Sequence, residues 1–408
     1  MRKPILTIFY QFNPWNSSIG GIQTVIRSFI KYAPSEFEVR LVGTGEPKSS
    51  TGVWQKTEYA GRSIQFMPLF NMLNDNVRGF IPTTVKYTAA LLGRCLASDF
   101  IHFHRLEPTL AALNWYGDKT LFIHNDIQQQ IAAGTSKKAM LWQYFPAGYF
   151  ALERFLIKQF DQIYSCNTES AKFYQERYPA VAERVTFLKN TVDTEIFYPL
   201  EPREQEKQRK LLAQQLGLPE QTRFVLFAGR LHPQKDPILL VRAYAALNDP
   251  SLHLLIAGDG ELAGEVRSEI ARLALCERVT MLGSVSFEKL AQLHRISSAF
   301  VLSSAYEGLP MVVLEALSSG TPVVTTNCGE TPRLLRADSG MVAYERTPNA
   351  IANALGHVLQ HAEDYPAVSC VRNAQPYAAH TVVSDVYKDM LHRWKQRSVS
   401  STTTAECI

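Results

Sequence analysis

One uninterrupted stretch, residues 300–326, constrains the fold of this chain more than any other part. A short apolar run at 299–302 has the length of a β-strand, and an apolar run at 311–318 predicts a short helix. Gly320 follows as a helix stop, and the β-branched run 323–326 predicts a second strand. A strand, a helix and a strand with such short connections form the building block of a parallel sheet.

Two glutamates of this unit lie at positions that favour contact with a ligand. Glu307 falls in the loop at the carboxyl end of the first strand, the edge where open α/β sheets bind ligands. Glu315 falls in the otherwise apolar helix, where a carboxylate is costly unless it has partners. The amino terminus of that helix also attracts phosphate. Taken alone, the pattern equally fits a Glu307 that is an ordinary turn residue and a Glu315 that is a solvent-exposed helix residue.

The residue order around these glutamates resembles a known signature. Residues 307–310 read Glu-Gly-Leu-Pro, Glu315 is followed by Ala, and residues 320–324 read Gly-Thr-Pro-Val-Val. This block resembles the retaining glycosyltransferases of family 4. The resemblance implies an α/β fold of the GT-B type, with two Rossmann-like domains, a parallel sheet in each and an interdomain cleft. It also implies the transfer of a hexosyl unit from a UDP- or GDP-sugar to a hydroxyl of a glycan, lipid-linked or small-molecule acceptor, in cell-surface polysaccharide or glycoconjugate synthesis.

A second segment resembles the same family. Arg230 and Lys235 flank a turn after a predicted strand, and in the family two such cations hold the diphosphate of the donor. Preorganised cations neutralise a leaving diphosphate without a metal. The alternative is a pair of solvated surface cations. By the same resemblance, Glu315 accepts hydrogen bonds from the ribose and Glu307 orients the sugar hydroxyls.

The first half of the chain supplies three further candidates. Gly20 and Gly21 lie between the first predicted strand and helix, where glycines let the backbone approach a ligand and leave helix N–H groups free for an anion. His124 ends a predicted strand and matches a family histidine that faces the donor sugar; His102 and His104 match less well. The alternatives are that Gly20 and Gly21 only form a flexible turn and that the histidines have a structural role. The residues expected to be catalytic are His124, Arg230, Lys235 and Glu307, and those expected to bind the donor are Gly20, Gly21, Arg230, Lys235, Gly283, Glu307, Gly308, Leu309 and Glu315.

The resemblance predicts the domain boundaries, because residues 190–197 resemble the family's crossing into the second domain. Residues 1–198 are expected to form the acceptor-binding domain and residues 199–379 the donor-binding domain. The helix at 380–397 is expected to pack back on the first domain, and 398–408 to be a disordered tail.

The cysteine spacing and the charge distribution indicate the compartment in which the protein is expected to function. The six cysteines are scattered, without a metal-site or disulfide spacing, so a reducing cytoplasm is expected. Residues 1–195 hold 21 Lys+Arg and 16 Asp+Glu, although the net charge of the whole chain is only +4. This basic excess fits peripheral contact with an anionic membrane at its inner face, and it equally fits a scatter of solvated charges. The amphipathic pattern at 83–97 fits membrane contact or packing on the sheet.

Several other partners and chemistries are not expected. The chain has no Asp-x-Asp, so no metal cofactor is predicted, and it has no dinucleotide fingerprint. A nucleic acid is not expected as a partner. Two rival functions stay open: a nucleotide-sugar epimerase on the same fold, and a non-catalytic protein that binds nucleotide-sugars.

Overall fold

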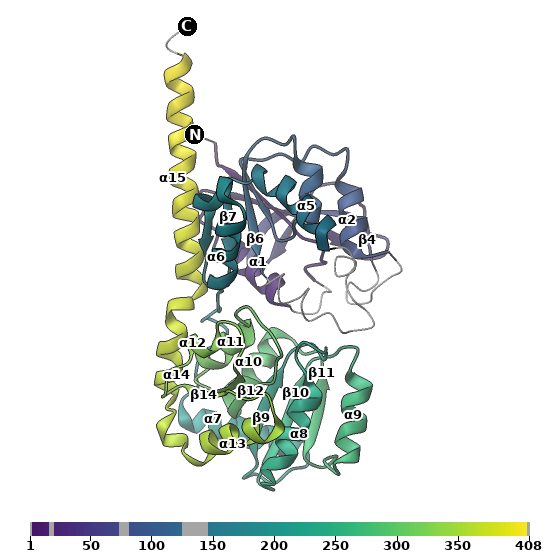
Figure 1. Cartoon of the computed structure of the whole chain (residues 1–408), viewed down its shortest axis with the longest axis vertical. Helices are drawn as coiled ribbons and strands as arrows, with labels where there is room; N and C mark the ends of the chain where they lie inside the picture. Colours follow the sequence, from purple (N-terminus) through teal and green to yellow (C-terminus); the bar gives the residue numbers. More distant parts are fainter. Residues whose placement is uncertain (1, 16–19, 73–80, 125–145, 406–408) are drawn as a thin grey trace. The chain divides into compact units, whose positions relative to one another are not determined.

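The computed structural model describes residues 2–15, 20–72, 81–124 and 146–405 (Figure 1). The chain divides into two compact units, Met1–Lys189 with Ala379–Ile408, and Asn190–Ala378. The first crossing therefore comes earlier than the predicted boundary after residue 198. Its physical reason is that the Asn190 side chain donates to the carbonyl of Leu309 at 2.6 Å, so the chain enters the second unit there.

The first unit contains an eight-stranded sheet in the order β3-β4-β2-β1-β5-β6-β7-β8. Among the described strands every pairing is parallel except that of the edge strand β3 with β4, so the predicted parallel sheet of this unit is confirmed with one antiparallel strand at its edge. The chain order reverses between β1 and β5. The strands are β1 (Ile5–Phe9), β2 (Glu38–Gly45), β3 (Gln55–Tyr59), β4 (Arg62–Asn71), β5 (Phe100–Phe103), β6 (Asp118–Ile123), β7 (Gln162–Ser165) and β8 (Val185–Phe187).

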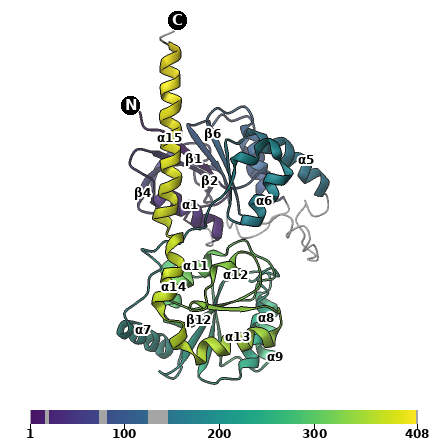
Figure 2. The same cartoon turned by 60° about the vertical axis from the view of Figure 1, so that its left-hand side comes forward.

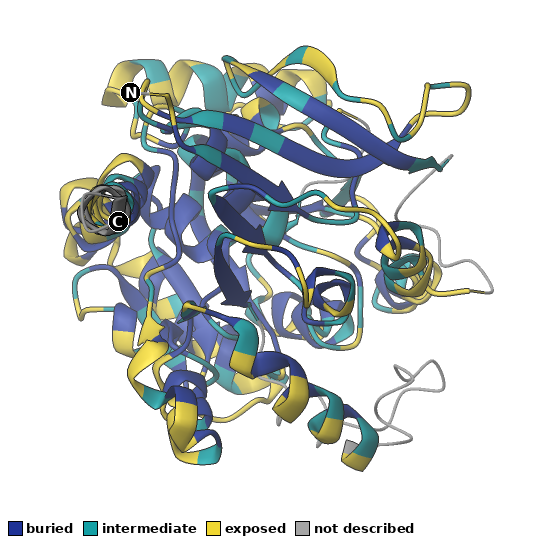
Figure 3. Ribbon diagram, turned by 90° about the horizontal axis from the view of Figure 1, so that it is seen from above, coloured by how far each residue is buried: buried dark blue, intermediate teal, exposed yellow. Residues whose placement is uncertain are grey.

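Helices and short 3₁₀ turns connect these strands. The described helices of this unit are α1 (Gly21–Lys31), α2 (Thr83–Leu91), α5 (Pro146–Leu156), α6 (Thr168–Arg177) and α15 (Ala379–Ala405). The 3₁₀ turns are η1 (Glu107–Ala112), η2 (Ile157–Gln159) and η3 (Pro179–Arg184). The strands are mostly buried, whereas the helices expose their outer faces (Figure 3).

The second unit contains a six-stranded sheet that is parallel throughout, in the order β11-β10-β9-β12-β13-β14. Counted within this unit, the strand order is 3-2-1-4-5-6, the order of dinucleotide-binding Rossmann folds, with its switch point between β9 and β12. The strands are β9 (Arg223–Ala228), β10 (Leu252–Ala257), β11 (Val279–Gly283), β12 (Ser297–Leu302), β13 (Val323–Thr326) and β14 (Gly340–Ala343).

Both faces of this sheet are covered by helices because its strands are apolar on both sides. On β9, Phe224 and Leu226 belong to one core cluster, whereas Val225 and Phe227 belong to the other. One face packs against α8 (Pro237–Leu247), α9 (Ala263–Arg272) and α13 (Pro348–Gln360), and the other against α7 (Pro202–Gln215), α10 (Phe287–Ile296), α11 (Met311–Ser318) and α14 (Ala367–Ala374). The remaining elements are α12 (Thr331–Leu334), η4 (Ala362–Asp364) and η5 (Gln375–Tyr377).

The strand–helix–strand unit predicted from residues 300–326 is confirmed as β12, α11 and β13. The helix α11 has the predicted bounds, and Gly320 follows it with φ +80°, a backbone conformation that favours glycine at a helix end. β13 pairs in parallel with β12, with Val323 opposite Phe300. The short connections therefore return the chain to the same sheet.

Helix α15 runs along the first unit (Figures 1 and 2). The Tyr387 hydroxyl donates to the carbonyl of Phe29 at 2.8 Å, and Arg393 Nε donates to Asp118 at 2.8 Å. The predicted disordered tail from residue 398 is wrong as far as Ala405, because the helix continues to that residue. The segment contains no glycine or proline that would stop it, and extending an existing helix is easier than nucleating one.

Loss of Arg393 is expected to destabilise the first unit. Asp118 is fully buried at the start of β6 and is bound by Arg393 and by the half-exposed Arg397. Removing one partner of a buried charge is strongly destabilising, so Arg393→Ala should lower the free energy of unfolding by about 2–3 kcal/mol. Urea denaturation measures this. The matched control is Lys388→Ala on the same helix, whose ion pair is solvent-exposed; an equal loss in both variants would contradict a specific role for Asp118.

Candidate active site

The candidate site of the second unit lies at the switch point of its sheet, where β9 and β12 end. Lys235 follows β9 and Glu307 follows β12, and Lys235 Nζ lies 2.5 Å from Glu307 Oε1. Ser304 donates its hydroxyl to the same carboxylate oxygen at 2.6 Å. The Lys235 side chain is 17% exposed and that of Glu307 7% exposed, so the ion pair is largely shielded from water.

Hydrogen bonds to backbone groups hold the loop after β9 against the loop after β12. The Ser303 hydroxyl bonds to the carbonyls of Lys235 and Asp236 at 2.8 and 2.9 Å. The N–H of Ala305 donates to the carbonyl of Gln234 at 2.8 Å. Ser303 and Ser304 lie directly after the apolar run at 299–302, and this position is the sequence signal for their role.

Asp236 turns the chain from the loop into helix α8. Its φ of 44° lies in the left-handed region, and its side chain accepts from the N–H of Leu239 at 3.2 Å, which caps the helix. Its other oxygen pairs with Arg346 Nη1 at 2.5 Å. Asp236 therefore fixes the turn that positions Lys235, a function that the sequence analysis did not assign.

Arg230 is exposed and, within the part of the chain that the structure describes, its guanidinium has no hydrogen-bond or ion-pair partner. Lys235 extends over the neighbouring Gly229, where a Cβ atom would lie 3.7 Å from Lys235 Cε. The structure thus places one paired and one unpaired cation in the segment that follows β9. Both remain available to an anion, since an ammonium has three donors and a guanidinium five.

Glu315 is buried in α11, with 2% of its surface exposed. Its Oε2 is buried and has no hydrogen-bond partner among the described residues. Burial raises the pKa of this carboxyl to about 8. The partners that the sequence analysis required for a carboxylate in this helix are therefore not supplied by the described part of the chain.

Gly283 is the last residue of β11 and Gly308 lies in the loop after β12, and the backbones of both form hydrogen bonds. The carbonyl of Gly283 accepts from the N–H of Gly258 at 2.7 Å, and the carbonyl of Gly308 accepts from Glu330 at 2.8 Å. Leu309 differs, because its side chain is buried in the core and its carbonyl accepts from Asn190. A donor could therefore reach Leu309 only through its backbone N–H.

Gly329 is a site residue that the sequence analysis missed. Its φ is +61°, and a Cβ atom there would lie 2.3 Å from the carbonyl oxygen of Gly308 and 2.4 Å from that of Glu307. Only glycine fits so close to this backbone. Gly329 therefore packs directly behind Glu307.

In the first unit, Gly20 and Gly21 begin helix α1. Gly20 is the N-cap residue, in extended conformation, and no side chain caps the helix. No acidic residue lies in its first turn, which leaves the positive end of the helix dipole uncompensated by side chains. A Cβ atom at Gly20 would meet only the flexible side chain of Gln23, so the backbone conformation does not itself require glycine there.

His124 follows β6 at the carboxyl edge of the first sheet. Its Nε2 lies 2.8 Å from Nδ1 of His104, which ends up beside it because β5 and β6 are parallel neighbours. Burial lowers the pKa of His124 to about 3, and the positive charge of Arg105 acts in the same direction. The structure therefore links His124 to one of the two histidines that the sequence analysis had ranked below it.

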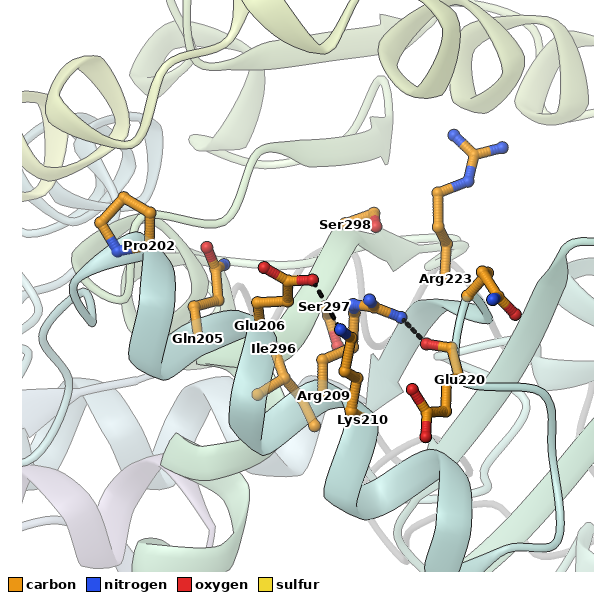
Figure 4. Close-up of a pocket in the computed structure, with 11 residues that line it drawn as sticks. Pro202, Gln205, Glu206, Arg209, Lys210, Glu220, Arg223, Ile296, Ser297 and Ser298 are labelled. Carbon is orange, nitrogen blue, oxygen red and sulfur yellow. Dashed lines mark hydrogen bonds and ion pairs between the residues drawn. The ribbon is translucent and has the colours of Figure 1, made fainter.

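A separate pocket of about 460 Å³ opens at the opposite, amino-terminal edge of the second sheet (Figure 4). Its cations are already bonded: Arg209 donates to the carbonyl of Glu220 at 2.6 Å, and Lys210 pairs with Glu206 at 3.0 Å. Because open α/β sheets bind ligands at the carboxyl ends of their strands, this pocket is not part of the candidate site.

No group of three His, Cys, Asp or Glu side chains suited to a metal ion occurs within residues 2–15, 20–72, 81–124 and 146–405. The expectation that no metal cofactor is needed stays a prediction. Over the same residues, none of the helices is both long enough and apolar enough to cross a bilayer.

Comparison with known proteins places this geometry in a family. Residues 19–196 match the model of the family described as Glycosyltransferase Family 4, and residues 208–375 match the Glycosyl transferases group 1 family. A D-inositol 3-phosphate glycosyltransferase of Streptomyces coelicolor is 28% identical over 62% of this chain and 60% of its own length. One of Corynebacterium glutamicum is 26% identical over 59% of this chain and 60% of its own. The matches thus span about three fifths of these curated relatives.

Solved structures show the same fold. Sucrose-phosphate synthase of Thermosynechococcus elongatus has a TM-score of 0.77 at 18% identity, covering 97% of this chain and 100% of that one. HepE of Anabaena, solved in complex with UDP-glucose, has a TM-score of 0.68 at 17% identity, covering 95% and 100%. The architecture is therefore of the GT-B type, with two Rossmann-like units. The chain belongs to the family-4 glycosyltransferases.

Proposed function

We propose that the protein transfers a hexosyl unit from a UDP- or GDP-sugar to a hydroxyl of a glycan, lipid-linked or small-molecule acceptor, in cell-surface polysaccharide or glycoconjugate synthesis. The observation that carries the proposal is the contact of Lys235 with Glu307 at the switch point of the second sheet. The same edge presents Arg230 without a partner among the described residues. Membership of the family supports the proposal.

Each donor group has a proposed counterpart. Arg230 and Lys235 stabilise the charge that develops on the leaving diphosphate. Glu307, held by Lys235 and Ser304, accepts hydrogen bonds from sugar hydroxyls. Glu315 accepts those of the ribose, which would supply the partner that its buried oxygen lacks among the described residues. Donor binding by the second unit and acceptor binding by the first are part of this proposal.

The first unit is proposed to contribute Gly20, Gly21 and His124. The uncapped start of α1 offers N–H groups to an anionic group of the donor. His124 positions the donor sugar and the acceptor hydroxyl. The transfer is proposed to retain the anomeric configuration by attack on the same face, without a covalent nucleophile and without a metal.

A thermal-shift screen tests the donor half of the proposal. UDP, GDP and their hexose conjugates are expected to raise the melting temperature, because a ligand at about 100 times its Kd stabilises the folded state by about 2.7 kcal/mol. Uridine and guanosine, which lack the diphosphate, serve as matched controls. A response to the nucleosides equal to that of the diphosphates, or no response to any of them, would contradict the proposed role of Arg230 and Lys235.

Product analysis with donor alone separates the rival functions. A transferase leaves the donor intact or hydrolyses it slowly, whereas an epimerase converts it to another nucleotide-sugar. A protein that binds the donor but transfers nothing to any acceptor of the tested classes would support the non-catalytic rival.

A membrane-linked acceptor has one supporting observation. Helix α2 packs on the sheet through Tyr87, whose hydroxyl donates to Val42, yet it exposes about half of Val85 and Leu92 beside the cations Lys86 and Arg94. The helix ends at Leu91, so the longer amphipathic helix predicted at 83–97 is wrong. We propose peripheral contact with the cytoplasmic face of an anionic membrane as a second property of this unit.

A further inference from the structure

The histidine pair at the carboxyl edge of the first sheet supports one more inference, which rests on the proposed function of His124. His104 Nδ1 and His124 Nε2 are 2.8 Å apart, and the two rings stack at 18°. Phe122 stacks on the ring of His104 at 4.6 Å between centroids, and His104 is 2% exposed. Packing therefore holds the orientation of His104 rigidly, and with it the direction of the shared hydrogen bond.

Burial favours the neutral form of both rings of the pair. Burial lowers the pKa of His104 well below its usual value, and the pKa of His124 falls to about 3 for the same reason. The charge of Arg105 further disfavours a proton on His124. Two neutral imidazoles share one hydrogen between them, so one ring must donate and the other accept.

The other nitrogen of His104 decides which ring donates. His104 Nε2 is buried and, over the residues that the structure describes, has no hydrogen-bond partner. If His104 accepted at Nδ1, its proton would sit on Nε2 as a buried N–H without an acceptor. Orphaned buried N–H groups are rarer in proteins than orphaned acceptors. The favoured arrangement therefore has the proton on Nδ1 of His104, which donates to Nε2 of His124.

We propose that His104 is a positioning residue that holds His124 in its Nδ1–H tautomer. His124 then offers an N–H donor to a hydroxyl of the sugar or acceptor. It has no free lone pair, because Nε2 accepts from His104, and so it cannot act as a general base. The hydrogen bond at Nε2 of His124 thus decides that Nδ1 carries the proton, as in other histidines whose tautomer is fixed by a neighbouring group.

Imidazole nitrogen NMR on ¹⁵N-histidine-labelled protein tests the tautomer directly and needs no substrate. Protonated and unprotonated ring nitrogens give well-separated ¹⁵N resonances, and long-range couplings to the ring carbons' hydrogens assign them. In the wild type, His124 should show a protonated Nδ1. A protonated Nε2 at His124 in the wild type would overturn the proposal without any variant.

Three variants refine the test. His104→Phe keeps the stacked ring but removes the hydrogen bond, and should move His124 toward the Nε2–H tautomer that histidine prefers in water. His104→Asn places an amide nitrogen near the position of Nδ1 and should restore the Nδ1–H form. His102→Phe is the matched control: His102 is fully buried on β5, the strand that His104 follows, and neither of its ring nitrogens has a partner among the described residues, so this change should leave His124 unaltered.

Transfer assays complete the experiment. His104→Phe should lower kcat by roughly tenfold, the rate equivalent of one hydrogen bond, with little change in KM for the donor, and His104→Asn should recover most of it. An unchanged tautomer in His104→Phe, or an unchanged kcat despite a changed tautomer, overturns the positioning role. A failure of the proposed function gives a different result from a failure of the His104 proposal. The wild type would then transfer no sugar, while its histidine tautomers would remain as expected.

Discussion

Replacing Glu315 by glutamine is expected to raise the melting temperature of the unliganded protein at pH 8 and, at the same time, to weaken nucleotide binding. The buried Oε2 of Glu315 has no partner among the described residues, and burial raises the pKa of the carboxyl to about 8. Glutamine has the same shape and carries no ionisable group, so it removes the cost of the buried acid.

The pH dependence of this effect follows from the direction of the shift. In the unfolded chain a glutamate has a pKa near 4.3, so above that pH the unfolded state loses its proton while the folded state keeps it. The folded state therefore becomes less stable as pH rises from about 4.5 to 8, by up to about 1.4 kcal/mol per pH unit. Glu315→Gln should stabilise the protein at pH 8 by up to about 4 kcal/mol and have little effect near pH 4.5.

Nucleotide binding should respond in the opposite direction. Ribose hydroxyls donate to an ionised carboxylate, and a hydrogen bond to a charged group contributes about 1.5–3 kcal/mol, so the glutamine variant should bind UDP or GDP roughly 10- to 100-fold more weakly. In the wild type the affinity should rise with pH up to about 8, because only the ionised form is a full acceptor. In the variant it should be independent of pH over this range.

Calorimetric titration and thermal melting at several pH values measure both effects. The matched control is Glu277→Gln, which changes an exposed glutamate of the same unit and should leave stability and affinity unaltered. Nucleotide affinity that falls as pH rises would contradict the role of Glu315 as an acceptor. A variant that is less stable than the wild type at pH 8 would contradict the absence of a protein partner.

The strand–helix–strand unit could be predicted closely because its signals are local. The apolar run of α11, its glycine stop at Gly320 and the β-branched run of β13 each depend on a few neighbouring residues. The same holds for the position of Glu307 after β12, since the carboxyl end of a strand is visible in the sequence. In this part of the chain, periodicity and turn residues point to the same structure.

The contacts between distant segments could not be predicted in the same way. The ion pair of Glu307 joins it to Lys235, 72 positions earlier in the chain, and the Ser303 hydroxyl bonds to the carbonyl of Lys235 across 68 positions. Gly329 packs against the carbonyls of Glu307 and Gly308 with a positive φ, a contact between two loops that the sequence does not indicate. His104 gave no sequence signal of its partner, because only the parallel register of β5 and β6 places it beside His124.

Two other differences have energetic causes. Disorder is predicted for residues 398–408 because they form the end of the chain, but helix α15, anchored by the bonds of Tyr387 and Arg393 to the first unit, extends into them as far as Ala405. The first unit ends at Lys189, before the boundary predicted after residue 198, and the side-chain bond from Asn190 to Leu309 joins residues 119 positions apart, a contact that is not visible in the sequence. In both cases a tertiary contact overrides a local preference.

The second large effect is expected from breaking the ion pair of Lys235 and Glu307. Variants of this pair should change the stability of the protein and its activity to different extents. Lys235→Met alone should lower the free energy of unfolding by about 3–5 kcal/mol, because Glu307, 7% exposed, keeps its charge without its cation. Glu307→Gln alone should be destabilising in the same way. The double variant should recover most of the stability, since a neutral pair of similar volume leaves no buried charge unpaired.

Activity should not recover in the double variant. Lys235 is proposed to stabilise the leaving diphosphate, and the loss of one preorganised electrostatic contact of this kind lowers kcat by about 10²–10³-fold. Denaturant unfolding and transfer rates of all four proteins form the cycle. Lys210→Met is the matched control, because its pair with Glu206 lies on the surface of α7 and should affect neither property. If the double variant regained turnover together with stability, the pair would act only by supporting the fold; a stable but inactive double variant would show that the pair is needed for the reaction itself.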